Sequence, residues 1–137
     1  MSSRQRHELD EGTRRLVNEA AAARTNAHAP YSGFAVGAAV RTVDGQVYCG
    51  CNIEISSYGL TMCAERVALF AARAAGAQEL EAIAVVGPGA GGAPTPPCGA
   101  CRQVIWDLAP KAEIYLAMPE GRVEVRAAID LLPDPFG

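Results

Sequence analysis

The most informative residues of this 137-residue chain are its five cysteines, Cys49, Cys51, Cys63, Cys98 and Cys101. An odd number of cysteines argues against a framework of disulfides. The first residues also lack the apolar segment of a secretory signal, so we expect no passage into an oxidising compartment. Metal binding, catalysis and burial in a core remain the open roles for these thiols.

Apolar periodicity predicts an alternation of helices and strands. A helical spacing of apolar residues runs over 8–27, and Asp44-Gly45 predicts a hairpin turn. Five strands are expected, over 34–42, 46–54, 80–86, 113–117 and 123–126. With two more helices between these strands and a helical turn near the C-terminus, the order of elements predicts a mixed sheet with helices packed on its faces.

Each of the two further helices begins next to cysteine. Thr61 is the expected N-cap of a helix that starts at Met62. Its apolar stripe is expected to comprise Cys63, Val67, Phe70, Ala71 and Ala74. A second helix is expected over 98–108, because the preceding Pro97 is well tolerated at a helix start.

Thiols at helix starts indicate a metal centre. Cys98 and Cys101 are three residues apart in one first turn, and Cys63 lies in another. Helix N-termini carry partial positive charge, which favours the thiolate form that binds metal. Three thiolates on one Zn²⁺ leave a tetrahedral position open, as catalytic zinc sites do. The alternatives are plain core thiols and a redox-active Cys-x-x-Cys pair, which would not require the third cysteine.

Glu65 follows Cys63 by two residues, on a different side of the predicted first turn. It is therefore placed to act as general acid and base at an open metal position without being a ligand. The alternative is a carboxylate that only stabilises a helix N-terminus. The neighbouring cysteine favours the catalytic role.

Asn52 and Glu54 share one face of the predicted return strand, because side chains alternate along a strand. An amide and a carboxylate on one face suit a sugar hydroxyl, since together they offer a donor and acceptors. The same alternation puts Cys49 and Cys51 on the opposite, apolar face. We therefore expect these two to be core thiols rather than metal ligands.

Charge and composition narrow the class of partner. The chain has 12 basic and 15 acidic residues, a formal net charge of −3, and no basic block. This argues against nucleic-acid binding and favours a small-molecule partner. No apolar run approaches the ~20 residues that cross a bilayer. The two histidines, His7 and His28, fit no spacing of metal ligands. We expect a soluble cytoplasmic protein with exposed histidines and no membrane partner.

Two motifs, Cys63-Ala64-Glu65-Arg66 and the P-C-G-A-C-R-Q-V-I segment over 97–105, together resemble the small cytidine deaminases of nucleoside salvage. Further matching stretches cover residues 30–38, 50–54, 57–66 and 131–136. The resemblance implies a three-layer α/β/α fold with a five-stranded mixed sheet, forming a single catalytic domain over 1–137. It places the chain in the class with three cysteine ligands.

The resemblance implies zinc-dependent hydrolytic deamination of cytidine and deoxycytidine to uridine and deoxyuridine in pyrimidine salvage. One Zn²⁺ per subunit would be held by Cys63, Cys98 and Cys101. Glu65 would take a proton from the attacking water, pass it to N3 of the cytosine ring, and then protonate the leaving amine. Arg66 resembles the arginine that bonds to the ligand thiolates and offsets their charge.

The same resemblance implies the substrate contacts. Asn52 and Glu54 would hold the ribose 3′-hydroxyl, Phe34 would line the pocket, and the backbone N–H of Ala64 would contact the 2-carbonyl of the pyrimidine. Tyr58 and Phe136 resemble residues that complete the site of a neighbouring subunit. A homotetramer with composite active sites is therefore expected.

Two other functions remain open. One is a deaminase for a modified cytosine nucleoside or a nucleoside antibiotic of the blasticidin S type, and the other is a non-enzymatic domain stapled by zinc. The Asn52 and Glu54 pair and the Phe136 tail favour an ordinary nucleoside. A nucleic-acid editing enzyme is the least favoured, given the charge, the length and the cysteine at position 63.

Overall fold

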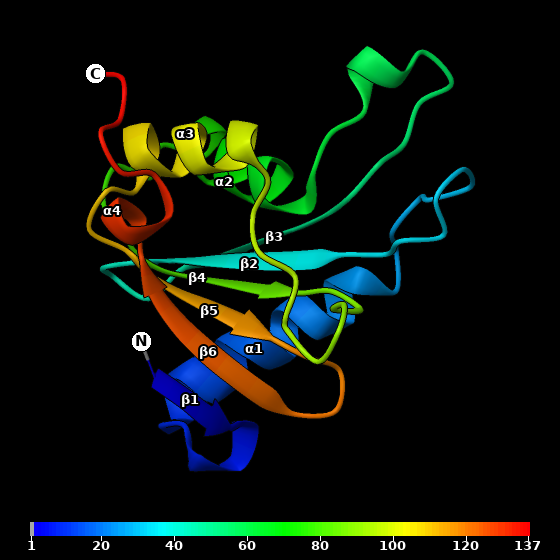
Figure 1. The fold of residues 1–137 in the computed structure, drawn as a ribbon. Coiled ribbons are helices and arrows are strands. Elements are labelled where there is room, and N and C mark those ends of the chain that lie inside the picture. The colour runs from blue at the N-terminus through cyan, green and yellow to red at the C-terminus, as the bar shows by residue number, and fades with distance from the viewer. Residues whose placement is uncertain (1) are drawn as a thin grey trace.

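A computed structural model describes residues 2–137 as a six-stranded sheet with helices on both faces (Figure 1). The strands are β1 (Ser2–Gln5), β2 (Gly37–Thr42), β3 (Val47–Cys51), β4 (Leu80–Val86), β5 (Glu113–Ala117) and β6 (Arg122–Ala127). The helices are α1 (Glu11–Arg24), α2 (Ala64–Ala74), α3 (Gly99–Leu108) and α4 (Ala128–Leu131), with short 3-10 helices η1 (Arg6–Glu8) and η2 (Tyr58–Leu60). None of the helices in residues 2–137 is both long and apolar enough to cross a membrane.

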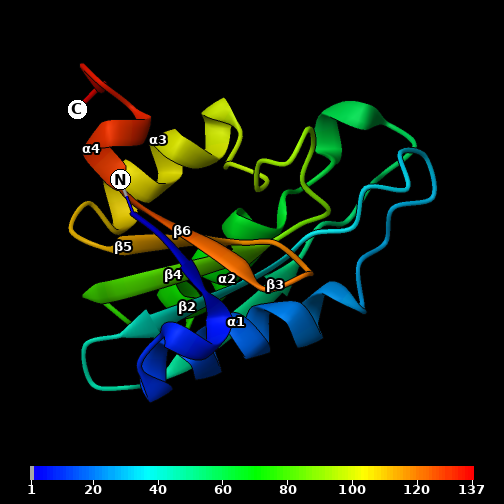
Figure 2. The same cartoon turned by 60° about the horizontal axis from the view of Figure 1, so that its bottom comes forward.

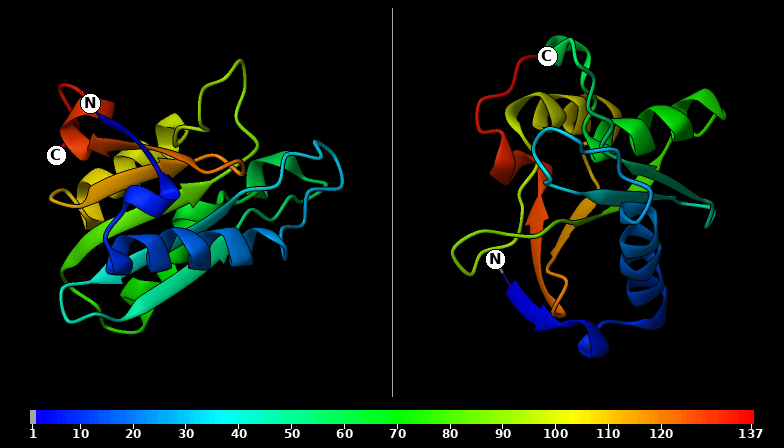
Figure 3. Two further views of the ribbon diagram at one scale, coloured as in Figure 1. Left: turned by 90° about the horizontal axis from the view of Figure 1, so that it is seen from below. Right: turned by 90° about the vertical axis from the view of Figure 1, so that its right-hand side faces the viewer.

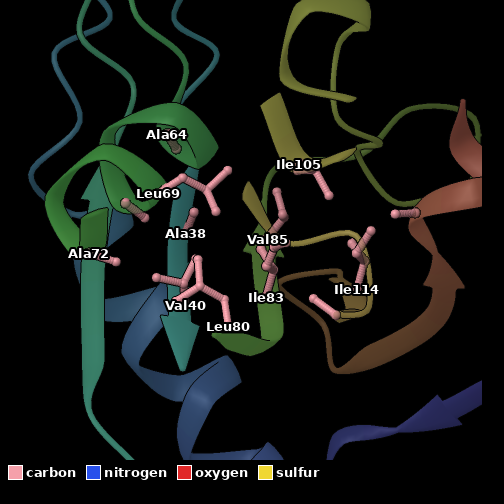
Figure 4. Packing of buried hydrophobic residues seen from close by; sticks show 14 of the residues in the cluster. Ala38, Val40, Ala64, Leu69, Ala72, Leu80, Ile83, Val85, Ile105 and Ile114 are labelled. Carbon is pink, nitrogen blue, oxygen red and sulfur yellow. The ribbon is translucent and has the colours of Figure 1, made fainter. Parts of the chain in front are cut away.

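The helices form two layers around the sheet, with α1 on one face and α2, α3 and α4 on the other (Figures 1 and 2). The core beneath α2 and α3 contains Leu69, Ile83, Val85, Ile105 and Ile114, all almost fully buried (Figure 4). A second core joins α1 to the other face of the sheet. The predicted three-layer α/β/α fold is confirmed.

The order of strands decides where α2 and α3 begin. In the sheet order β1-β6-β5-β4-β2-β3, only β4 and β5 pair in parallel. Because β3 and β4 both pair antiparallel with β2, they run in the same direction. Their carboxyl ends therefore lie at the same end of the sheet. There α2 follows β3 in the chain, and α3 follows β4. Figure 3 shows the loops after α1 and β3 extending past the same end of the sheet.

The strands depart from the prediction at the edges. The sheet has six strands rather than five, because β1 pairs antiparallel with β6. β4 and β5 have the predicted bounds, whereas β2 begins at Gly37 rather than at position 34 and β3 ends at Cys51 rather than at position 54. The residues beyond these ends form the loops that surround the site.

Two predicted helices are shorter than expected. α1 begins at Glu11 because Asp10 is its N-cap, with the Asp10 carboxylate accepting a hydrogen bond from the Thr13 N–H at 2.8 Å. It ends at Arg24 rather than at position 27. α3 begins at Gly99, with Cys98 as its N-cap.

The predicted start and face of α2 are wrong. Its N-cap is Cys63 rather than Thr61, and the face that meets the sheet consists of Ala64, Glu65, Ala68, Leu69 and Ala72. The expected stripe lies largely outside, with Phe70 exposed. Gly50 on β3 explains the choice, because a Cβ there would come within 2.5 Å of the Ala68 nitrogen. The helix packs against bare backbone, which favours small residues at the contact.

The prediction that Cys49 is a core thiol is also wrong. Cys49 pairs opposite Ala39, whose side chain belongs to the core between α1 and the sheet. Cys49 therefore lies on the predicted face of its strand. The strand is at the edge of the sheet, however, and Cys49 is exposed there while Cys51 is half-buried. His7 and His28 are exposed, as expected.

Candidate active site

Three cysteine sulfurs meet where α2 and α3 begin. The Sγ atoms of Cys63, Cys98 and Cys101 all lie within 4.8 Å of one another, and those of Cys63 and Cys98 are 3.7 Å apart. Two thiolates bound to one tetrahedral Zn²⁺ would lie about 3.8 Å apart, given Zn–S bonds of about 2.3 Å. The donor set therefore fits zinc, a metal that favours thiolate ligands.

Hydrogen bonds make the three thiols unequal. Arg66 donates from Nη2 to the Cys63 sulfur at 3.3 Å. Hydrogen bonding from Cys101, and then from Arg66, lowers the pKa of Cys63 to about 5. The pKa of the fully buried Cys101 is raised, because its proton is shared with Cys63 and burial disfavours a second charge. The exposed Cys98 accepts a hydrogen bond from the backbone N–H of Cys101 at 3.4 Å.

Glu65 is a buried carboxyl group in the first turn of α2, with only 4% of its surface exposed. Burial raises its pKa to about 7. A carboxyl group with such a pKa exchanges protons near neutral pH, as a general acid and base must. The alternative of a simple helix-stabilising carboxylate does not account for the burial, because a charge that only complements a helix terminus needs no desolvation.

A cavity of about 240 Å³ opens beside these groups. Seven of the residues proposed from the sequence line it: Phe34, Asn52, Glu54, Cys63, Ala64, Glu65 and Cys98. Six further residues complete the wall: Ser32, Val36, Thr61, Met62, Thr95 and Pro96. Cys101 and Arg66 do not line this cavity. Arg66 contacts the cysteine cluster through its hydrogen bond to the Cys63 sulfur.

Asn52 fastens one wall of the cavity to the end of β3. Its Oδ1 accepts from the Val36 N–H at 2.9 Å, and its Nδ2 donates to the Phe34 carbonyl at 2.8 Å. Both bonds hold the segment that carries Phe34. The amide nitrogen retains a second N–H beyond the bond to Phe34.

Glu54 holds the turn over 31–33. Its carboxylate accepts from the backbone N–H groups of Tyr31 at 2.9 Å and Ser32 at 3.1 Å, and from the Ser32 hydroxyl. The Ser32 hydroxyl bond is the main reason why the pKa of Glu54 is lowered. Sequence reasoning missed Ser32, because a serine between Tyr31 and Gly33 is typical of a turn and carries no periodic signal.

The structure brings Tyr58 to the rim of the cavity but leaves Phe136 elsewhere. Tyr58 is 72% exposed and lines a shallower adjoining pocket, with its ring edge against Tyr31 at a centroid distance of 5.6 Å. Phe136 is 86% exposed on the C-terminal tail. The tail follows α4 past α3, away from the loop that contains η2 (Figure 1).

Comparisons with known proteins agree with this arrangement. Residues 10–117 match the model of the cytidine and deoxycytidylate deaminase zinc-binding region. A cytidine deaminase of Halalkalibacterium halodurans is 48% identical over 122 residues, covering 88% of this chain and 91% of that protein. A cytidine deaminase of Mycobacterium tuberculosis is 43% identical over 122 residues, covering 89% of this chain and 87% of that protein.

Solved structures give the same result. The crystal structure of a cytidine deaminase from Burkholderia pseudomallei superposes with a TM-score of 0.84 at 54% sequence identity, covering 89% of this chain and 97% of that chain. That of the Mycobacterium tuberculosis cytidine deaminase gives a TM-score of 0.78 at 41% identity, covering 94% and 98%. Fold, cysteine cluster and sequence thus agree: the chain belongs to the cytidine and deoxycytidylate deaminase zinc-binding family.

Proposed function

We propose that this chain is a zinc-dependent cytidine deaminase that converts cytidine and deoxycytidine to uridine and deoxyuridine in pyrimidine salvage. The observation that carries the proposal is the buried carboxyl of Glu65, which lines a cavity together with two of three clustered cysteines. The names of the relatives support the reaction and the nucleoside class. We propose one catalytic domain over 1–137.

Cys63, Cys98 and Cys101 would hold one Zn²⁺ per subunit. When bound, the metal lowers the pKa of a coordinated water toward neutrality. The cluster would carry a net charge of −1 with three thiolates, and Arg66 offsets it through its bond to Cys63. The environment of the thiols thus suits the metal that the chemistry requires.

Glu65 would move the protons of the reaction. Its carboxylate accepts a proton from the attacking water and delivers it to N3 of the pyrimidine ring while a new C–O bond forms at C4. It then takes the proton of the new C4 hydroxyl and passes it to the amine at C4, so that the C–N bond breaks, the C4 carbonyl forms and ammonia leaves. A pKa of about 7 lets one carboxyl group perform both transfers near neutral pH.

The remaining cavity residues would bind the nucleoside. Phe34 offers an apolar wall for the base, and the backbone N–H of Ala64, at the start of α2, would donate to the 2-carbonyl. Asn52 and Glu54 lie together on the wall and would hold the ribose 3′-hydroxyl, with the second N–H of Asn52 as a donor and the Glu54 carboxylate as an acceptor.

We further propose a cytoplasmic homotetramer, in which Tyr58 and Phe136 complete the site of a neighbouring subunit. The exposure of both aromatic side chains supports this, because neither is buried within its own chain. Two α3 side chains also hold the tail by its backbone: Gln103 donates to the Phe136 carbonyl at 3.0 Å and Trp106 to the Gly137 carbonyl at 3.3 Å. The free thiols fit a reducing compartment.

A spectrophotometric assay of cytidine, deoxycytidine and blasticidin S, with zinc quantified, tests the proposal. Glu65→Gln should keep zinc and fold yet lose at least about 100-fold in kcat, because no group remains to move the proton. Glu11→Gln is the matched control, since Glu11 is an exposed glutamate in the first turn of α1. Cys98→Ala should lose both metal and turnover.

Substantial turnover by Glu65→Gln would exclude Glu65 as the proton carrier. A protein that binds zinc but deaminates none of these nucleosides would favour the non-enzymatic domain in which zinc only stabilises the fold. Preferential turnover of blasticidin S would favour the antibiotic deaminase.

A further inference from the structure

Arg102 connects two distant segments of the chain. It lies in the first turn of α3, half-buried, with its backbone N–H donating to the Cys98 carbonyl at 2.9 Å. Its side chain donates from Nε to the Pro97 carbonyl at 2.8 Å and from Nη1 to the Leu131 carbonyl at 3.0 Å. One guanidinium thus joins the residue before a candidate metal ligand to the end of α4.

The Pro97 carbonyl is a group that needs this donor. Pro97 is almost fully buried, and a buried carbonyl without a partner costs about 1–3 kcal/mol. The peptide bond that contains this carbonyl also fixes the backbone of Cys98, the N-cap of α3. A rotation of that peptide would move the Cys98 sulfur relative to the other two sulfurs. The bond from Arg102 holds the peptide in its present orientation.

The Leu131 carbonyl lies at the other end of the guanidinium. It is the last residue of α4, where carbonyl groups lack partners within the helix. The segment that follows is the tail with Phe136, whose carbonyl accepts from Gln103, the next residue of α3. Arg102 therefore fastens the base of the tail to the same helix turn that presents Cys98.

We infer that Arg102 is a positioning residue, which orients Cys98 for the metal through the Pro97 carbonyl. The inference rests on the proposed zinc binding by Cys63, Cys98 and Cys101. Within residues 2–137, Arg102 donates no hydrogen bond to a sulfur, unlike Arg66, so its action on the metal passes through the backbone. Partners that orient ligands in this way typically contribute about 10–100-fold to metal affinity.

The geometry requires arginine rather than any cation. The bond to Pro97 comes from Nε, the fourth atom of the side chain beyond Cα, and lysine carries a methylene at that place. Lysine keeps the positive charge and the aliphatic stem, but it cannot donate from the Nε position. Arg102→Lys therefore separates the Pro97 bond from the charge.

The test measures zinc release from the intact protein into excess chelator, followed with a metallochromic dye. Arg102→Met and Arg102→Lys should both release zinc at least 10-fold faster than the wild type. Arg73→Met is the matched control, because Arg73 also donates to a backbone carbonyl, that of Ala77 at 3.2 Å, at the far end of α2. It should release zinc at the wild-type rate. Thermal unfolding of the metal-free proteins shows whether each variant folds.

The zinc-release rates of these variants decide whether Arg102 orients Cys98. Release from Arg102→Met that is no faster than from Arg73→Met would overturn the inference. Wild-type release from Arg102→Lys would overturn it too, because charge rather than the Nε bond would then be responsible. If Arg102→Met does not fold, Arg102→Lys decides alone. A wild-type protein that holds no zinc would refute the proposed function and this inference together, whereas zinc in the wild type with unchanged release refutes only the inference.

Discussion

Arg66 donates a hydrogen bond from Nη2 to the sulfur of Cys63 across 3.3 Å. Cys63 is the N-cap of α2 and Arg66 lies in its first turn, so the helix itself brings the cation to the thiolate. Together with the bond from Cys101, this contact keeps the pKa of Cys63 at about 5.

The first prediction concerns that contact. In metal-free Arg66→Gln, we expect the pKa of Cys63 to rise by about 1 to 3 pH units, because the neighbouring positive charge is lost. Less thiolate is then present at mildly acidic pH, so zinc should be lost at a higher pH than in the wild type. Thiolate absorbance in the ultraviolet, recorded against pH, measures the shift. An unchanged titration curve would show that Cys101 alone stabilises the thiolate.

The second prediction concerns Glu65 and stability. Burial raises its pKa from 4.5 to about 7, so between these values the folded protein holds a proton that the unfolded chain has released. Stability contributed by this group is therefore present below pH 4.5 and lost as the pH rises through 7. Metal-free Glu65→Gln should exceed the wild type by about 3 kcal/mol near pH 8, and match it near pH 4.

Urea unfolding of the two metal-free proteins at both pH values measures this difference. A stability gap of the same size at the two pH values would mean that Glu65 does not titrate between them, and the assignment of its raised pKa to burial would be wrong.

The third prediction concerns Gly50. An added Cβ would lie 2.5 Å from the Ala68 nitrogen and 2.6 Å from the Ala64 carbonyl oxygen, both backbone atoms of α2. Gly50→Ala must therefore displace the helix that carries Glu65, and we expect a loss of about 1–3 kcal/mol together with a reduced kcat. Gly12→Ala serves as the control, because its added Cβ would meet nothing closer than 3.6 Å. Equal stability and kcat in both variants would show that α2 has room to shift.

The fourth prediction concerns Phe136. Its ring is 86% exposed, so Phe136→Ala should change the stability of the single chain by less than about 0.5 kcal/mol. In the proposed homotetramer we expect KM for cytidine to rise by up to about tenfold, since an aromatic contact contributes about 0.5–1.5 kcal/mol. Ile129→Ala, an exposed apolar residue of α4, is the control. Steady-state kinetics and analytical ultracentrifugation would distinguish a substrate contact from weaker assembly, and no change in either would remove Phe136 from the site.

The cluster of Cys63, Cys98 and Cys101 was predictable because local rules apply to these residues. Pro97 before a Cys-x-x-Cys pair indicates a helix start, and helix starts favour thiolates whatever the rest of the chain does. The apolar strands β4 and β5 were predictable for a related reason: they are buried on both faces, so a short continuous apolar run identifies them.

The buried face of α2 was not predictable in the same way. Alanines occur both on the buried face of this helix and on the expected stripe, so periodicity cannot decide between Phe70 and Leu69 as the core residue. The decision comes from Gly50, a residue of another element. β1 escaped prediction because its polar residues form a strand only by pairing with β6, a contact that sequence periodicity does not report.

Two of the three sulfurs belong to N-caps of helices packed on the sheet. Apart from Ala64 and Glu65 of α2, the rest of the cavity wall comes from the connecting segments 25–36, 52–62 and 87–97. Protein engineers can therefore randomise the loop positions other than Asn52, Glu54 and Pro97 while the helices that present the sulfurs stay in place. A library built in this way would evolve acceptance of bulkier nucleosides without having to re-establish metal loading in each variant.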